Sequence, residues 1–443
     1  MASLSLADCL AAAKLGAPSL RTSQLTLDNA AAQLAVDLGA NGLKVGESAG
    51  YFHEGDLPGY ASPSTSAVSA SGTGVVGENV QAGLSLSGPS TSLGLSALQG
   101  IAAGGDQSTA LSISGSQVVY DGYPGGRPAG ISSQAYYSYQ IAQVAYDAAL
   151  KSLAYQVKQA YYTLLGDQDG LVADQATLKQ AQEELAQMQG YFTAGRATRL
   201  DVLQVQVALT QAQLNVRSAQ NAIQTDMRRL SLAVGWPIEK QYSVAEVAPP
   251  AVPRIDSKAA IDTAFANRPE LKTFDLNLAY AGVDLSLQKS QYAPAVSVNG
   301  SLGFGAAWAA PGSGVGTFSA GVTVALPPIY DGKQQASLVR QKMDQIDSYK
   351  VQRDTERQSI SIDVQNALFS VKDASDRQAL ARQNLEQAQG VYDLQKEKFT
   401  LGSATALDVM TAFSTLATAQ AGLEQAKSTY NLSVLNLYNV MGL

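Results

Sequence analysis

Hydrophobic and polar residues alternate over several short segments of this chain of 443 residues. Around 294–305, for example, Val296, Val298 and Phe304 fall on one face, with Ser, Asn and Gly on the other. Because successive side chains of a β-strand point to opposite faces, a period of two predicts strands. We expect four strands, over about 79–88, 108–119, 294–305 and 316–327.

The four predicted strands contain no charged residue. An antiparallel sheet in a soluble protein also alternates, but its wet face usually carries charged side chains. Short uncharged alternating segments separated by turn residues are typical of transmembrane β-barrels. We therefore favour membrane-spanning strands, and a half-buried sheet of a soluble protein is the alternative.

A second pattern, with apolar residues three and four positions apart, predicts long helices. Leu368, Val371 and Ala374 illustrate it within a stretch that contains no proline. Such a helix of roughly 60 residues would be about 90 Å long. We expect long helices over about 130–191 and 332–398, tip turns at 192–199 and 399–405, and return helices over about 199–234 and 406–441.

We expect the chain to consist of two tandem pseudo-repeats, 1–235 and 268–443, joined by a Pro-rich linker and a short equatorial helix at 236–267. Phe192–Val202 and Phe399–Val409 are identical at eight of eleven positions. Each repeat is expected to read helix, two strands, long helix, turn, long helix, giving a mixed α and β membrane protein.

The first repeat carries 41 extra residues, because the spacing between equivalent positions falls from 251 to 210 between its start and its second strand. We expect this extra segment, around 43–78, to be a loop or hairpin elaboration. The chain's single histidine, His53, is expected to be a loop residue within it.

Composition excludes several functions. Only 15% of residues are charged, against about 25% in soluble domains. The net charge of −7 argues against nucleic acid as a partner. One cysteine and one histidine argue against a disulfide framework, a metal centre and a catalytic constellation. We therefore expect no enzyme, cofactor or metal, and we expect Cys9 to be a small buried residue of a first helix.

The sequence also bears on a transmembrane helix and on a signal peptide. No run of about 18 apolar residues exists that could form a transmembrane helix. The first residues lack the basic and apolar regions of a signal peptide, which leaves a cytoplasmic chain or a removed signal peptide as alternatives.

Four membrane strands require more than one chain. Every backbone polar group in a bilayer must be paired, so a spanning sheet has to close on itself. Two copies would supply eight strands, whose interior is filled by side chains, whereas three copies would leave a lumen. The small polar residues of the strands favour a water-filled interior, and hence an oligomer of three or more.

The ordered set of motifs resembles the TolC-like outer-membrane efflux proteins. It comprises the duplicated Phe-Thr-x-Gly-x-Ala-Thr-x-Leu-Asp-Val, the Asn-Arg-Pro-Glu-Leu string at 267–271 and the Tyr-Asp-Gly string at 120–122 and 330–332. The resemblance implies a homotrimer whose 12-stranded outer-membrane β-barrel continues into a long periplasmic α-helical barrel. It implies a passive exit duct for efflux or type I secretion in a diderm bacterium.

The resemblance also implies partners, namely a periplasmic adaptor and an inner-membrane transporter of the RND, MFS or ABC class. The adaptor would meet the tip turns, at Gly195, Arg196, Ala197, Thr198, Gly402, Ser403, Ala404 and Thr405. The plainer interpretation is an αα-hairpin turn in which glycine ends a helix. The alternative to the whole assignment is a structural trimeric coiled-coil surface protein or adhesin without a transport role.

A periplasmic gate is the second implied site. Asp201 and Asp408 follow Thr198 and Thr405 by three residues, the spacing of a capping box. In the family, a carboxylate aligned with Asp408 belongs to the ring that constricts the periplasmic entrance, and the second carboxylate position is Thr411 in this chain. A cap alone and a cap that also gates are the two alternatives, with Asp408 favoured over Asp201.

The strand-to-helix junctions form the third set, which we expect to be structural. Tyrosine suits an interfacial aromatic girdle and aspartate suits a helix N-cap. The residues are Tyr120, Asp121, Gly122, Tyr330, Asp331 and Gly332.

Overall fold

The computed structural model describes residues 3–40, 42, 44–54, 77–88, 90–102, 107–247, 256–307, 314–328 and 333–443. The chain divides into two compact units, each built from several segments. The helical unit comprises Met1–Leu27, Ala142–Phe274 and Val351–Leu443. The sheet unit comprises Asp28–Ile141 and Asp275–Lys350.

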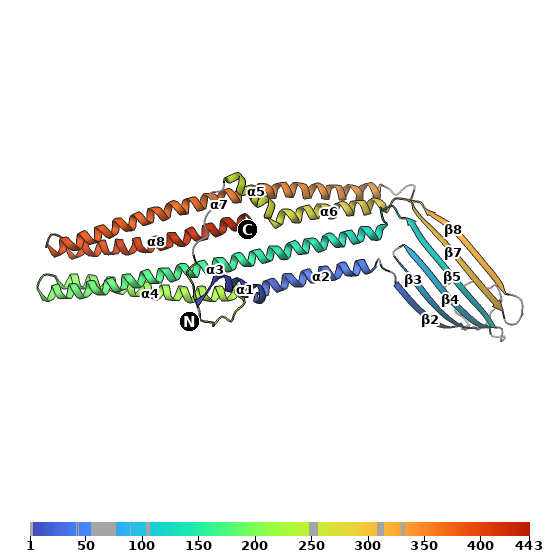
Figure 1. Ribbon diagram of the computed structural model, residues 1–443, viewed down its shortest axis with the longest axis horizontal. Helices are drawn as coiled ribbons and strands as arrows, with labels where there is room; N and C mark the ends of the chain where they lie inside the picture. Colours follow the sequence, from blue (N-terminus) through green and yellow to red (C-terminus); the bar gives the residue numbers. More distant parts are fainter. Residues whose placement is uncertain are drawn as a thin grey trace, which may run out of the picture. The chain divides into compact units, whose positions relative to one another are not determined.

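Helices make up most of the described chain (Figure 1). In chain order they are α1 (Leu6–Gly16), α2 (Pro18–Ala40), α3 (Arg127–Thr193), α4 (Arg199–Val234), α5 (Ser257–Asn267), α6 (Pro269–Ser290), α7 (Gln334–Thr400) and α8 (Ala406–Val440). Among the described residues no helix is apolar over enough of its length to cross a membrane.

The helical unit owes its core to small and branched apolar residues at helical spacing. Ile360, Val364, Ala367 and Val371 form one buried stripe of α7, and they pack against α5 and the end of α8. Fully burying one such Val, Leu or Ile side chain contributes about 1.5–3 kcal/mol. The stripe therefore helps to hold α7 against α8, together with a second cluster nearer the tip, and the α3–α4 hairpin repeats the arrangement with Val157, Leu164, Leu230 and Val234.

Helix α1 is anchored beside the α3–α4 hairpin. Its Cys9 is fully buried, as the sequence predicts. The short strand β1 (Ser3–Leu4) pairs in parallel with β6 (Ser243–Val244). The Tyr161 hydroxyl group of α3 donates to the carbonyl oxygens of Leu4, at 3.0 Å, and Ala245, at 2.7 Å.

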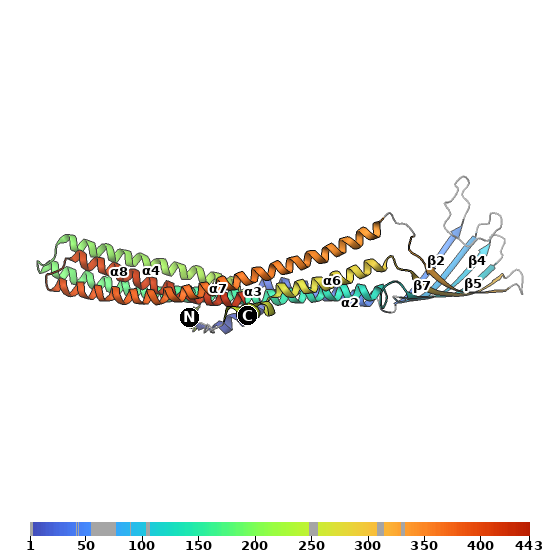
Figure 2. The same cartoon turned by 90° about the horizontal axis from the view of Figure 1, so that it is seen from above.

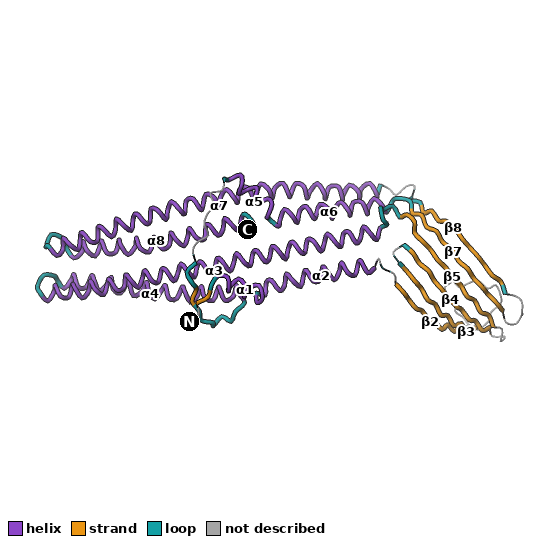
Figure 3. The backbone as a smooth tube through the Cα atoms, viewed as in Figure 1, coloured by secondary structure: helices purple, strands orange, loops and turns teal. Residues whose placement is uncertain are grey.

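The sheet unit contains one antiparallel sheet in the order β2-β3-β4-β5-β7-β8 (Figure 3). Every neighbouring pair in this order is antiparallel. The strands are β2 (Lys44–Glu54), β3 (Gly77–Ser87), β4 (Thr91–Ala102), β5 (Gln107–Tyr120), β7 (Ala295–Ala307) and β8 (Val315–Ala325).

The prediction of two sheet strands before α3 is wrong, because the six-stranded sheet takes four strands, β2 to β5, from that part of the described chain. Strand β4 follows the same uncharged alternation as its neighbours and was overlooked between two predicted strands. Strand β2 lies in the segment around 43–78, for which a loop or a hairpin is expected, and it pairs with β3 as an antiparallel hairpin; residues 55–76 lie outside the described part of the chain. His53 lies in β2 rather than in a loop, with its Cα in register with that of Glu78. The expectation of twelve strands from three chains assumed four strands per chain, whereas the described sheet has six.

The two faces of the sheet differ in chemistry. One carries hydroxyl groups that meet across strands, in the pairs Ser92–Ser116 at 2.9 Å, Ser96–Ser112 at 2.7 Å and Ser301–Ser319 at 2.7 Å. The other face is apolar and exposed, and Phe318 is 75% exposed. The strands do not lie in one plane, since β2 and β4 rise away from β7 (Figure 2).

Candidate functional site

Two helix-hairpin tips form the candidate site in the helical unit. At the first, Gly195 has φ 72° and its N–H donates to the carbonyl of Phe192 at 3.0 Å, while the N–H of Arg196 donates to that of Tyr191 at 2.8 Å. This pair of bonds and the left-handed glycine constitute a Schellman motif, which ends α3.

The second tip repeats this geometry. Gly402 has φ 76°, and its N–H donates to the carbonyl of Phe399 at 3.0 Å. The N–H of Ser403 donates to the carbonyl of Lys398 at 2.9 Å. A residue with a Cβ atom is sterically strained at a positive φ, so backbone conformation alone explains the glycine at both tips.

Each return helix begins with the predicted capping box. The Asp201 carboxylate accepts hydrogen bonds from the N–H and the hydroxyl group of Thr198, both at 2.7 Å. The Asp408 carboxylate accepts from the N–H of Thr405 at 2.8 Å and from its hydroxyl group at 2.7 Å. Each carboxylate thereby satisfies a backbone donor at a helix N-terminus, where negative charge is also favoured by the helix dipole.

The Asp408 residue is exposed to solvent, and Asp201 is partly buried. The hydrogen bonds from Thr405 lower the pKa of Asp408 below its ordinary value, so this group stays ionised at neutral pH. Thr411, which lies one turn further along α8, is exposed and donates its hydroxyl hydrogen to the carbonyl of Leu407 at 2.8 Å. The negative charge of this turn therefore comes from Asp408.

The two hairpins pack against each other just behind the tips. Ala197 of the first tip and Ala406 after the second belong to one apolar cluster with Met188, Val202 and Val205. The rings of Tyr191 and Phe399 meet edge to face, with centroids 5.4 Å apart. Residues of both predicted tips thus share one packed layer, while the turn residues Arg196 and Ser403 remain exposed.

A largely buried ion pair joins the hairpins further from the tips, and no sequence motif indicates it. Glu184 of α3 is 4% exposed, and its Oε1 accepts from Lys396 Nζ of α7 at 2.5 Å and from the Tyr392 hydroxyl group. Burial would lower the pKa of Lys396, but the Glu184 carboxylate outweighs it and raises the pKa. Burial and the same carboxylate raise the pKa of Tyr392.

An acidic pair links α3 and α4. Burial, a hydrogen bond to Asp226 and the charge of Asp226 together raise the pKa of Asp167 to about 7. Asp226 is 6% exposed and forms an ion pair with Arg229 at 2.8 Å. The described residues contain no group of three His, Cys, Asp or Glu side chains placed to hold a metal ion, so we assign this pair no ligand.

The strand-to-helix junction in the sheet unit has a structural role. Asp121 accepts from the N–H of Arg127, the first residue of α3, at 2.6 Å. Gly122 has φ 88°, and a Cβ there would lie 2.6 Å from the carbonyl oxygen of Ser290. Tyr120 is half exposed at the end of β5. The equivalent residues Tyr330, Asp331 and Gly332 lie outside the described part of the chain.

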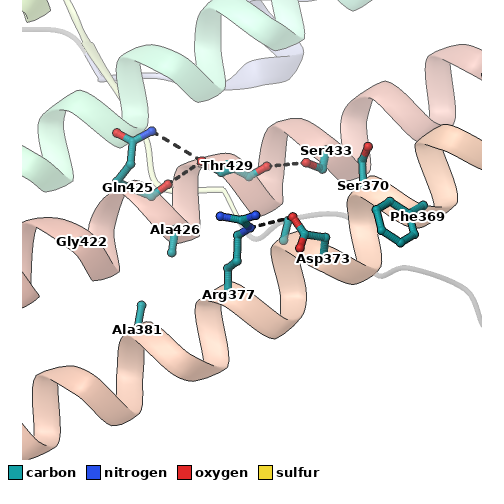
Figure 4. A pocket seen from close by; sticks show the side chains of 11 residues that line it. Phe369, Ser370, Asp373, Arg377, Ala381, Gly422, Gln425, Ala426, Thr429 and Ser433 are labelled. Atoms are coloured by element: carbon teal, nitrogen blue, oxygen red, sulfur yellow. Dashed lines mark hydrogen bonds and ion pairs between the residues drawn. The ribbon is translucent and has the colours of Figure 1, made fainter.

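An open groove of about 600 Å³ runs between α7 and α8 (Figure 4). The small residues Ala381, Gly422 and Ala426 leave it open, and the Arg377 guanidinium pairs with Asp373 at its wall, at 2.7 Å. Small residues in a helix face allow close approach of a further helix. No sequence motif marked this groove, because it is formed by residues about 50 positions apart in the chain.

A family model described as outer membrane efflux protein matches residues 79–236 and 260–443. The toluene efflux pump outer membrane protein TtgC of Pseudomonas putida is 25% identical over 334 residues, covering 72% of this chain and 66% of that protein. The pyoverdine export outer membrane protein OpmQ of Pseudomonas aeruginosa is 25% identical over 325 residues, covering 68% and 66%. These matches thus span slightly less than two thirds of each relative.

Solved structures show the same fold. A membrane protein from Pseudomonas aeruginosa aligns with a TM-score of 0.76 at 18% identity, covering 99% of this chain and 90% of that one. The outer membrane protein VceC from Vibrio cholerae aligns with a TM-score of 0.73 at 14% identity, covering 99% and 96%.

Proposed function

The chain belongs to the outer membrane efflux protein family, and from this membership we propose that it is the passive exit duct of a tripartite efflux or type I secretion system. It is an outer-membrane protein of a Gram-negative-type bacterium. Because the relatives are named for efflux and export, we place efflux before protein secretion. The duct carries out no chemistry, and its energy comes from an inner-membrane transporter of the RND, MFS or ABC class.

The observation that carries this proposal is the two-faced sheet. Its apolar face is exposed, its other face is lined by serine and threonine hydroxyl groups, and neither β2 nor β8 has a second neighbour among the described strands. In a bilayer such a sheet must close with further copies, with hydroxyl groups toward water and apolar groups toward lipid. We therefore propose a homotrimer in which the two tandem repeats of each chain build one barrel and one helical tunnel.

We assign the tips two roles within that duct. The turns at 195–198 and 402–405 contact a periplasmic adaptor, because they lie at the ends of the helical hairpins and most of their residues are exposed, whereas Ala197 and Ala404 are partly buried. Asp408 forms the entrance ring of the trimer, with Thr411 as its uncharged neighbour and Asp201 as the equivalent cap of the first hairpin. Three ionised carboxylates brought close together attract cations and repel one another, so separating them favours opening.

An experiment in cells tests the duct and its adaptor together. A photo-crosslinking amino acid at exposed Ser403 is expected to capture one periplasmic adaptor with a helical hairpin, and the same probe at exposed Gln345 of α7 is the control. Deleting the gene should lower resistance to the compounds that the captured system exports. An intact trimer that captures no adaptor from either position and whose loss leaves resistance unchanged would favour the adhesin.

A further inference from the structure

The first and last strands of the sheet leave their outer edges unpaired in the single chain. Strand β2 pairs only with β3, and β8 pairs only with β7, among the described strands. Both edge strands have eleven residues. A row of unpaired backbone groups of that length is not tolerated in lipid. The edges of this sheet therefore need a partner that offers a strand of equal length.

We infer that β8 of one copy pairs with β2 of the next, so that the trimer forms an eighteen-stranded barrel rather than a twelve-stranded one. The inference rests on the proposed function, because it takes the trimer from there. The strand directions suit it: β2 leaves the helix-side end of the sheet after α2, and β8 returns to that end before α7. A β8–β2 contact between copies is then antiparallel, like every other contact in the sheet.

The register of the sheet makes the contact specific. Lys44 pairs with Ser87, Ser87 with Ser92, Ser92 with Ser116, Ser116 with Asn299, and Asn299 with Gly321. The start of β2 is therefore level with Gly321 of β8 in the same chain. Closing a barrel requires strands tilted by about 35–45°, which staggers this line from one copy to the next.

The size of the stagger follows from strand geometry. Six strands about 4.8 Å apart are about 29 Å wide, so a tilt of 35–45° displaces the line by about 20–29 Å, or about six to eight residues. Only displacement into β2 is possible, because the strand begins at Lys44. A stagger of six pairs Thr323 with Ser48 of the next copy, and a stagger of eight pairs Ala325 with Ser48.

Both registers keep the two faces of the sheet continuous. The Thr323 hydroxyl group donates to Asn299 on the hydroxyl-lined face, at 3.1 Å. Ser48 lies on that same face, because a Cβ added at its partner Gly83 would be 2.8 Å from its Oγ. The charged residues Lys44 and Glu47 fall at the helix-side end of β2, where a barrel strand reaches the headgroups.

Eighteen strands enclose an aqueous channel of the width found in the largest porin-type barrels. Its wall would be lined mainly by serine, threonine, asparagine and glycine, since β4, β5, β7 and β8 contain no charged residue. The outer-membrane portion of this duct is thus wide and carries little charge on its wall, with Lys44 at the helix-side end of β2, which leaves most of the selection to the periplasmic end and to the transporter.

Cysteine pairs in a Cys9→Ala background test the inference on the full-length protein in membranes. We expect Ser48→Cys with Thr323→Cys, or with Ala325→Cys, to oxidise to a covalent trimer of three 46.2 kDa chains. The matched control, Ala49→Cys with Thr323→Cys, places the thiols on opposite faces and should stay uncrosslinked. In a twelve-stranded barrel that excludes the β2–β3 hairpin, the same tilt over four strands would instead bring Ser96→Cys to Gly321→Cys.

The outcomes separate the two proposals. A trimer by native mass that crosslinks through Ser96 and Gly321, or that crosslinks through none of the pairs, overturns the eighteen-stranded barrel and leaves the duct standing. Crosslinked dimers without trimers overturn it as well. A protein that is not oligomeric in detergent contradicts the proposed function itself.

Discussion

The carboxylate of Asp408 holds the start of α8 by accepting two hydrogen bonds from Thr405, at 2.8 Å from its N–H and 2.7 Å from its hydroxyl group. Asp201 and Thr198 repeat this contact at the start of α4. The cap fully explains an aspartate at this position as far as the single chain is concerned. A gating role must therefore be separated from capping by experiment.

Substitutions at Asp408 and at Thr405 distinguish the effect of the carboxylate charge from the effect of the helix cap. Asp408→Asn removes the charge but keeps an oxygen that can accept from Thr405, whereas Thr405→Ala weakens the cap and keeps the charge. If three Asp408 carboxylates constrict the entrance, Asp408→Asn and Asp408→Ala raise the single-channel conductance severalfold, and Thr405→Ala leaves it near the native value. Equal conductance in all the variants would reduce Asp408 to a cap.

Removing Lys396 alone should destabilise the protein more than removing both charges of the Glu184–Lys396 ion pair. Lys396→Met leaves a 4%-exposed carboxylate without its cation, which costs about 2 kcal/mol after allowance for the 40% exposure of the lysine side chain. Adding Glu184→Gln removes the stranded charge and should recover most of the loss. Thermal melting followed by circular dichroism checks both variants. A double variant no more stable than Lys396→Met would contradict this ion-pair explanation.

Stability should depend on pH through Asp167. Its pKa in the folded protein is about 7, above the ordinary value of 3.8, so the folded chain binds more protons than the unfolded chain between these values. Stability therefore falls as pH rises from about 4 to 7, and the penalty is complete above 7. Asp167→Asn should raise the melting temperature at pH 8 and leave it nearly unchanged at pH 4. Asp147→Asn, at an exposed position of the same helix, is the control and should leave the pH dependence of the melting temperature unchanged.

Alanine substitutions at three glycines distinguish the cost of a positive φ from the cost of steric overlap. Gly235 has φ 83°, and a Cβ there would overlap the carbonyl oxygen of Gly16, so Gly235→Ala should cost about 3 kcal/mol or more. Gly195 has φ 72° and open space, so Gly195→Ala should cost about 1 kcal/mol. Gly390→Ala, within α7 and with open space, should stabilise by about 1 kcal/mol. Melting temperatures in any other order would contradict this reading of the backbone.

The helical part of the fold could be predicted closely from sequence. The return helix expected over 199–234 is Arg199–Val234 in the structure, because its Thr198 cap and its Gly235 terminus are both local signals. The long helices lie within about three residues of expectation for the same reason, since proline-free amphipathic sequence continues until a glycine ends it.

The sheet and the contacts between hairpins could be predicted less well from the sequence. Strand β4 had the right alternation, but a two-strand template for each repeat left no place for it. For the segment of β2 the sequence predicts only a loop or a hairpin, because Lys44 and Glu47 break the uncharged pattern that defined the other strands. The Glu184–Lys396 and Asp167–Asp226 contacts depend on which faces of separate helices meet, and neighbouring residues in the sequence do not encode that.

The most direct test of the proposed duct is single-channel recording of the detergent-purified oligomer in a planar lipid bilayer. The protein alone, without nucleotide or partner, should insert and produce discrete, uniform conductance steps, and Asp408→Asn should enlarge them. A correctly assembled trimer that does not insert, or that inserts and passes no current in native and Asp408→Asn forms, would contradict the assignment of this protein as an outer-membrane channel.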